Sequence, residues 1–110
     1  MTEENPRNPR ASIRSRYADD PLMGQIVQRF SMALGERSTQ FDAAMAEANL
    51  ERLAALAHQL KGTAGGYGYD SIGLAAAALE RETIAIEADL VLVRERVEDL
   101  ILLCKAASTK

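Results

Sequence analysis

Tryptophan is absent from this 110-residue chain, and it has only three tyrosines and two phenylalanines. The single cysteine, Cys104, excludes an internal disulfide, and one cysteine with one histidine cannot form a zinc site of the usual kind. No apolar stretch approaches the roughly 20 residues that span a membrane, and the polar N-terminus has no signal-peptide core. We therefore expect a soluble cytoplasmic protein with one domain, since the chain is too short for two.

The chain has little net charge, −3, but its charges are unevenly distributed. Residues 1–16 carry four arginines against two glutamates, whereas residues 17–110 carry nine Lys or Arg against fourteen Asp or Glu. An acidic body argues against nucleic acid as the main partner. Residues 1–18 contain two prolines and no apolar period, so we predict a disordered basic N-terminal arm, followed by a helical domain over residues 19–110.

Apolar residues recur at helical spacing through that domain, and no stretch alternates with the period of two that is typical of a strand. Helix starts are predicted at Asp19 or Asp20 before Pro21, at Ser38 or Thr39, at Asn49, at Asp70 or Ser71, and at Asp89. Gly35 is expected to end the first helix, the glycines around Gly66 the third, and the fourth should reach Ile86. The pattern predicts an all-α antiparallel four-helix bundle, with an additional short N-terminal helix capping one end.

His58 is the only histidine, and it falls in the third predicted helix. On a helical wheel the apolar stripe lies on the far side from His58 and consists of Leu53, Leu56, Leu60 and Ala64. Within about 40° of His58 lie Glu51, Ala54, Gly62 and Gly65, and about 60° to either side lie Ala55 and Lys61. The histidine is therefore predicted to face away from the core, among residues with little side chain.

A solvated surface histidine is the simplest interpretation, but the glycines argue against it. Gly62 in a helix interior costs about 1 kcal/mol relative to alanine, which benefits a surface helix only if something must come close. We therefore predict that Gly62, Gly65, Ala54 and Ala55 keep His58 accessible to a large partner. Lys61, one turn on, places an ammonium near any anion attached to the ring.

The fourth predicted helix repeats the small-residue face, with Gly73, Ala76, Ala77 and Glu80 on one side. These small residues fit close helix packing as well as a functional role. A carboxylate near an imidazole accepts its second ring N–H, fixes the tautomer and leaves the other nitrogen free to attack. Glu80 is the candidate for this role, and a solvated glutamate is the alternative.

A neutral imidazole is a good nucleophile for an acyl or a phosphoryl group. Acyl transfer needs a serine or cysteine nucleophile, and Cys104 lies in the apolar stripe of the last helix. Phosphoryl transfer needs mainly positioning and charge neutralisation, which His58 and Lys61 supply in part. The glycine-rich run does not form a P-loop, because Lys61 precedes Gly62 in a helical context. We therefore expect a phosphocarrier with no ATP-dependent kinase activity of its own.

The run His58-Gln59-Leu60-Lys61-Gly62-Thr63-Ala64-Gly65-Gly66-Tyr67-Gly68, with Leu79-Glu80 further on, resembles the histidine-containing phosphotransfer (HPt) domain family. The family pattern is roughly H-x-L-K-G-[ST]-[SA]-x-x-x-G, then a Leu-Glu or Leu-Gln pair. The resemblance covers residues from about 20 to 107 and identifies the domain at residues 19–110 as HPt-like. It implies that His58 is the phosphoacceptor, that Lys61 neutralises the phosphate, that Gly62 opens space for the partner, and that Glu80 accepts the ring N–H.

The resemblance also implies a role in a multistep phosphorelay. His58 would accept a phosphoryl group from a phosphoaspartate on a response-regulator receiver domain and pass it to an aspartate on another receiver. No cofactor of the chain's own is expected, since Mg²⁺ belongs to the receiver. Some members carry a second basic residue where this chain has Ile84, with Arg81 nearby. We expect a monomeric, free-standing shuttle that works with a hybrid sensor kinase, the alternative being a fragment of such a kinase.

Two other functions are alternatives to phosphotransfer. A non-catalytic helical adaptor would use the small-residue face around His58 only to dock signalling partners, although such a dock has no need of Lys61. A DNA-binding regulator fits poorly, because the helix that carries His58 offers phosphates only Arg52 and Lys61.

Overall fold

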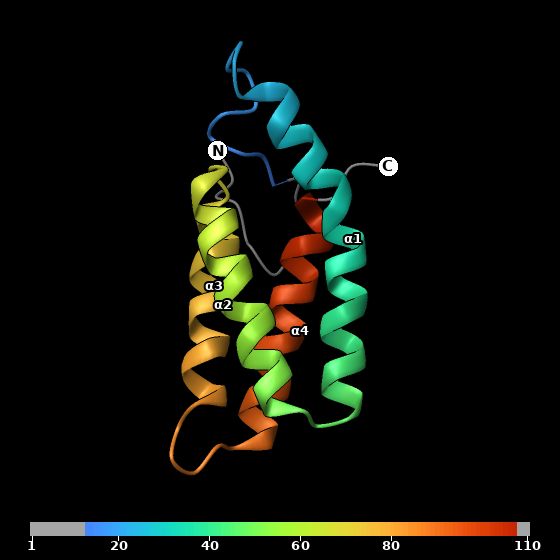
Figure 1. The fold of residues 1–110 in the computed structure, drawn as a ribbon, viewed down its shortest axis with the longest axis vertical. Helices are drawn as coiled ribbons and strands as arrows, with labels where there is room; N and C mark the ends of the chain where they lie inside the picture. The colour runs from blue at the N-terminus through green and yellow to red at the C-terminus, as the bar shows by residue number, and fades with distance from the viewer. Residues whose placement is uncertain (1–12, 108–110) are drawn as a thin grey trace, which may run out of the picture.

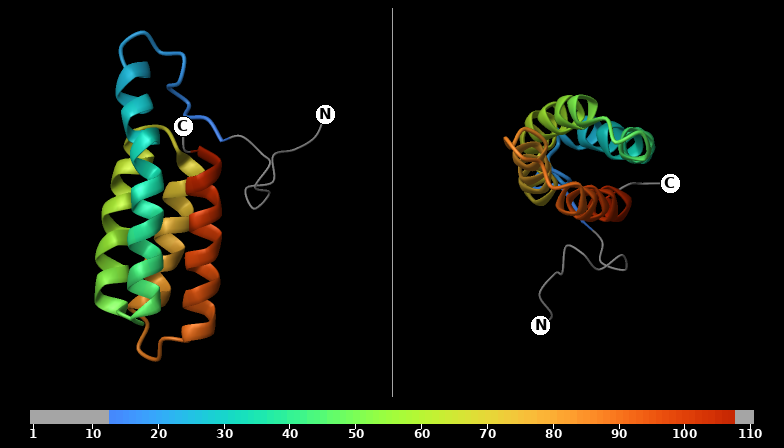
Figure 2. Two further views of the ribbon diagram at one scale, coloured as in Figure 1. Left: turned by 90° about the vertical axis from the view of Figure 1, so that its right-hand side faces the viewer. Right: turned by 90° about the horizontal axis from the view of Figure 1, so that it is seen from below.

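The computed structural model describes residues 13–107, which form four helices and no strand (Figure 1). The helices are α1 (Gly24–Ala46), α2 (Leu50–Gly66), α3 (Asp70–Thr83) and α4 (Leu90–Ala107). Successive helices run antiparallel, and in the end view they follow one another around a common core, with α4 returning beside α1 (Figure 2). The predicted all-α antiparallel four-helix bundle is confirmed.

The structure has one long helix where the sequence predicted two. α1 runs through Gly35 without a break, and its buried residues keep helical spacing across that glycine, from Leu34 to Ser38 and Phe41. The hydroxyls of Ser38 and Thr39 donate to carbonyls four residues back in the same helix, so neither caps a new one. One exposed glycine costs about 1 kcal/mol, which the packing of a continuous apolar face outweighs.

The predicted short capping helix is consequently not a separate element between residues 13 and 107. Its residues form the first turns of α1, which project beyond the ends of α2 and α4 (Figure 1). α1 itself begins at Gly24, later than the predicted start at Asp19 or Asp20, and its N-cap Met23 makes no side-chain capping hydrogen bond. In the turn that precedes the helix, the Asp20 carboxylate accepts the backbone N–H groups two and three residues on, at 2.7 and 2.9 Å.

The predicted starts of α2 and α4 are confirmed by their caps. The Asn49 side chain accepts the backbone N–H three residues on at 3.0 Å, and Asp89 accepts those two and three residues on at 2.9 and 3.3 Å. α3 begins at Asp70 as expected but ends at Thr83, short of Ile86. The Thr83 hydroxyl donates to the carbonyl three residues back at 2.7 Å, within this last turn. Ile86 lies in the connection to α4, where it is fully exposed.

The core lies between the four helices and is built from aliphatic side chains with few rings. α2 contributes the predicted positions Leu53, Leu60 and Ala64, which are fully buried. Cys104 is also fully buried, as predicted, and burial raises the pKa of its thiol to about 12, which makes it an inert packing residue. No helix between residues 13 and 107 is long and apolar enough to cross a membrane.

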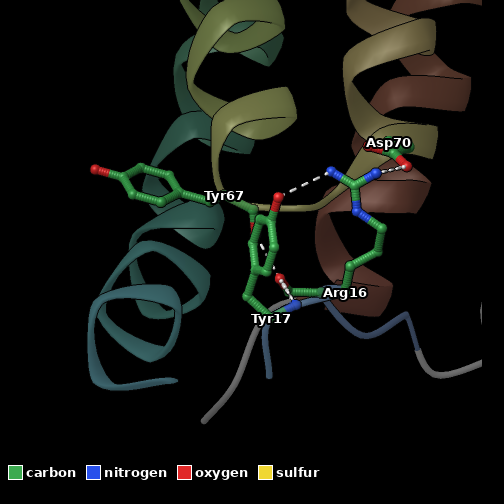
Figure 3. A network of polar contacts seen from close by, with 5 residues as sticks. Arg16, Tyr17, Tyr67 and Asp70 are labelled. Atoms are coloured by element: carbon green, nitrogen blue, oxygen red, sulfur yellow. Dashed lines mark hydrogen bonds and ion pairs between the residues drawn. The ribbon is translucent and has the colours of Figure 1, made fainter. Parts of the chain in front are cut away.

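Residues 13–18, here called the strap, lie against the end of the bundle where α2 connects to α3 (Figure 3). The buried Ser15 hydroxyl donates to the carbonyl of Tyr67, the Arg16 N–H donates to the carbonyl of Gly68 at 3.0 Å, and the Arg16 guanidinium pairs with Asp70 at 3.0 Å. The predicted basic arm at residues 1–18 includes these positions, and its residues 1–12 lie outside the described residues. The boundary at residue 19 stays a prediction.

Gly68 shapes the connection that the strap covers. Its φ of +84° lies in the left-handed region that favours glycine. A Cβ at this position would lie 2.6 Å from the Ser15 hydroxyl oxygen and 2.9 Å from the Tyr17 ring. Glycine is therefore required here by the backbone conformation and by the contact with the strap.

Candidate phosphotransfer site on α2 and α3

α2 presents His58 on its outer face. The buried residues of α2 are Leu53, Ala57, Leu60 and Ala64, and the His58 side chain on the opposite face is 69% exposed. The orientation that the helical wheel predicted is confirmed. A histidine in this position contributes little to the core and is open to a partner.

Glu80 of α3 lies directly beside His58. Its Oε2 is 2.9 Å from Nδ1 of the ring, and its side chain is 20% exposed. An ionised carboxylate only accepts hydrogen bonds, so the ring nitrogen that faces it must be the N–H donor. The lone pair of the neutral imidazole is then on Nε2, which is the nitrogen available for attack.

Lys61 completes the group from one turn further along α2. Its Nζ donates to the other carboxylate oxygen of Glu80, Oε1, at 2.7 Å, and its side chain is 41% exposed. The Lys61 hydrogen bond is the largest influence on the pKa of Glu80 and lowers it; partial burial opposes this, and the His58 hydrogen bond adds to the lowering. The carboxylate is therefore held ionised at neutral pH, as the His58 tautomer requires.

The small residues around His58 have two different environments. A Cβ at Gly73 of α3 would lie 3.6 Å from both the Gly65 nitrogen and the Lys61 carbonyl oxygen, which is ordinary van der Waals contact, so position 73 packs against α2 with room for an alanine. A Cβ at Gly62 or Gly65 would meet nothing within 4 Å. Internal packing therefore does not explain why position 62, in the middle of a helix, is glycine.

The two alanines near His58 complete this face. Ala55 is exposed and Ala54 is half-buried. Because an alanine side chain ends at Cβ, neither residue projects far from the surface of α2 beside the His58 ring. Of the predicted site residues, the three with long side chains, His58, Lys61 and Glu80, are thus in contact in the structure. The proposed role of the small residues in partner access stays a prediction.

Comparison with known protein families adds the deciding observation: a family model described as the Hpt domain matches residues 25–108. The chain belongs to the Hpt domain family. No curated protein and no solved structure matches the chain in the corresponding comparisons. The matched range covers all four helices except Gly24, the first residue of α1, and the strap lies before it.

Membership of the Hpt family supports a histidine phosphotransfer role in phosphorelays, where Hpt domains interact with receiver domains. The openness of the site agrees with a macromolecular partner. Hollows of about 360 and 260 Å³ lie elsewhere, one between the strap, α1 and α4 and the other between α3 and α4, and His58, Lys61 and Glu80 line neither.

The direct Lys61–Glu80 pair is the part of this Hpt site that the sequence did not predict. On the wheel Lys61 lies about 60° from His58, and only the side on which α3 packs decides whether it meets Glu80. Ile84, one turn after Glu80, is 68% exposed. Across residues 13–107 no cluster of three or more His, Cys, Asp or Glu is placed to hold a metal ion.

Proposed function

We propose that His58 is the phosphoacceptor of this Hpt domain. It takes a phosphoryl group from a phosphoaspartate on one receiver domain and passes it to an aspartate on another. The observation that carries the proposal is the Glu80 carboxylate, which contacts His58 Nδ1 at 2.9 Å and Lys61 Nζ at 2.7 Å. Glu80 thereby fixes the tautomer of the His58 ring and holds the Lys61 ammonium next to it.

The geometry supports attack by Nε2. The Nε2 lone pair forms a bond to phosphorus while the bond from phosphorus to the aspartyl oxygen breaks, and the carboxylate of the donor leaves. The ring keeps its Nδ1 proton and gains positive charge, which the ionised Glu80 carboxylate stabilises. Transfer to the second receiver reverses these steps and restores the neutral ring.

Lys61 is proposed to neutralise the transferred phosphoryl group. Its side chain is flexible and 41% exposed, so its ammonium can turn from Glu80 toward phosphoryl oxygens on the neighbouring ring. The donor's charge would be balanced by the Mg²⁺ expected on the receiver, and the Hpt chain itself is expected to need no cofactor. It remains a phosphocarrier in this proposal, with no kinase activity toward ATP.

A non-catalytic adaptor is the competing proposal. The face formed by Gly62, Gly65, Ala54 and Ala55 would dock a signalling partner without any transfer. The Lys61–Glu80–His58 group favours transfer, because an apolar dock gains nothing from three polar side chains at its centre. The two proposals differ in what happens when only the ring is changed.

The decisive experiment uses His58→Gln, which keeps a polar side chain at the same exposed position. Purified wild-type protein incubated with a ³²P-phosphorylated receiver should gain label that is labile in acid and stable in base, as expected for a phosphohistidine. The variant should gain none while its melting temperature and receiver binding are unchanged. Labelling of the variant, or normal signalling by it in cells, would favour the adaptor.

The remaining partner assignments belong to the same proposal. We expect a monomer that works in the cytoplasm with a hybrid sensor kinase and does not depend on nucleic acid. Size-exclusion chromatography with light scattering tests the first point. Phosphotransfer profiling against purified receiver domains identifies the donor and the acceptor.

A further inference from the structure

The connection from α3 to α4, with the first turn of α4, exposes an unusual amount of large aliphatic surface. Eight large apolar side chains are exposed across residues 13–107, and four of them fall within the eight positions 84–91. Their exposed fractions are 68% for Ile84, 103% for Ile86, 50% for Leu90 and 70% for Val91. Single exposed aliphatics are ordinary, but a concentration of them indicates an interaction surface. These four residues are called the apolar loop patch below.

Ile84 connects this patch to the phosphotransfer site. Its backbone N–H donates to the Glu80 carbonyl at 3.2 Å, so it completes the helical turn that follows Glu80. It therefore lies on nearly the same face of α3, about 6 Å along the axis from the residue that contacts His58. The rest of the patch continues from Ile84 toward the end of the bundle.

A protein that reaches His58 must also cover Ile84. An interface of standard size takes up roughly 800 Å² on each partner, which corresponds to a disc of about 16 Å radius. Centred on His58, such a disc extends well past the turn that carries Ile84. The partner at this position is the receiver domain, since its aspartate has to meet the histidine.

The surface around His58 also needs an anchor that it does not itself contain. Gly62, Gly65, Ala54 and Ala55 allow close approach but offer little apolar area. Binding energy at protein interfaces is concentrated in a few large side chains that become fully buried. Ile84 is the nearest large exposed aliphatic in sequence and helical position to the His58–Glu80 contact.

We propose that Ile84, extended by Ile86, is the apolar anchor through which this Hpt domain binds its receiver. The inference rests on the proposed function, because it assigns the patch to the partner that exchanges phosphoryl groups with His58. The complementary surface on the receiver would be apolar, next to the loop that carries its aspartate.

The test compares Ile84→Glu with a matched control, Leu74→Glu, at an exposed leucine of α3. Leu74 is 74% exposed, but it borders the hollow between α3 and α4. The probe is a receiver domain that phosphorylates the wild type, charged with acetyl phosphate. Transfer rates are measured against the concentration of the Hpt protein. Ile84→Glu should raise KM about tenfold or more with kcat nearly unchanged, and Leu74→Glu should behave as wild type.

Further measurements distinguish a docking role of Ile84 from a structural one. Ile84→Leu should restore KM to within about twofold of wild type, because it preserves volume and hydrophobicity. The hydrolysis rate of phosphorylated His58 and the melting temperature should be unchanged in Ile84→Glu, since neither involves the receiver. Ile84→Ser gives the same comparison without an added charge and should also raise KM.

Several outcomes would overturn the inference. Equal KM values for Ile84→Glu and Leu74→Glu would contradict the proposed role of Ile84 as an anchor. A loss of kcat at constant KM would mean instead that Ile84 supports the site geometry. Loss of a concentration-dependent dimer with unchanged transfer would assign the patch to self-association. If no receiver labels the wild type, the proposed function fails and the inference fails with it; normal transfer to Ile84→Glu overturns the inference alone.

Discussion

Replacing Gly62 with alanine should make this Hpt domain more stable and, at the same time, a poorer phosphoryl acceptor. A Cβ at position 62 would meet nothing within 4 Å, so alanine fits the folded structure without strain. Helix propensity then stabilises the protein by about 1 kcal/mol, which corresponds to a rise in melting temperature of about 4–8 °C. The added methyl lies one turn from His58 on the same face, about 5–6 Å away between Cβ atoms.

Transfer should fall as the side chain grows, because the donor's aspartyl phosphate must approach across this position. A displacement of about 1 Å from the productive geometry costs on the order of 10²-fold in rate, so Gly62→Leu should lose about that much and Gly62→Ala less. The assay is single-turnover phosphotransfer from a charged receiver, paired with thermal melting. Gly35→Ala is the control, since Gly35 is exposed in the interior of α1 and should gain stability without losing transfer. Wild-type transfer by Gly62→Leu would refute the access argument.

Other substitutions test the charged residues of the site and the contact of Gly68 with the strap. Lys61→Ala should slow transfer about tenfold at low salt and less at high salt, as measured by stopped-flow transfer; a rate equal to wild type at low salt would contradict its role. Because Lys61 lowers the pKa of Glu80 from 4.5, the stability that this carboxylate contributes is present above pH 4.5 and is lost as the pH falls through the lower folded-state value. Glu80→Gln should therefore melt with a weaker dependence on pH in this acid range, and an unchanged dependence would show that the pair contributes nothing. Gly68→Ala should lower the free energy of unfolding by about 1–3 kcal/mol in urea titrations, because its φ of +84° and the Ser15 hydroxyl both oppose a Cβ, and phosphotransfer should be retained.

The orientation of His58 was predictable because it depends only on helical periodicity. The apolar spacing of α2 and the Asn49 cap fix the face that is buried, and His58 lies opposite it whatever the other helices do. Membership of the Hpt family was likewise carried by local residues, the run from His58 to Gly68.

Features that depend on tertiary packing were not predictable in the same way. Gly35 and Ser38 favour a helix end locally, but the continuous buried face of α1 against its neighbours overrides them. The Lys61–Glu80 contact requires knowing on which side of α2 the next helix packs. The strap is held by backbone groups and by Ser15, which no periodicity marks.

The central claim is that His58 carries the phosphoryl group on Nε2 while its Nδ1–H remains hydrogen-bonded to Glu80. The most direct test is ³¹P and ¹⁵N NMR of the protein after phosphorylation by a receiver domain, with the histidine ring labelled with ¹⁵N. The account predicts a phosphorus coupling to Nε2 and a protonated Nδ1. A phosphoryl group on Nδ1, or on any residue other than His58, would contradict it.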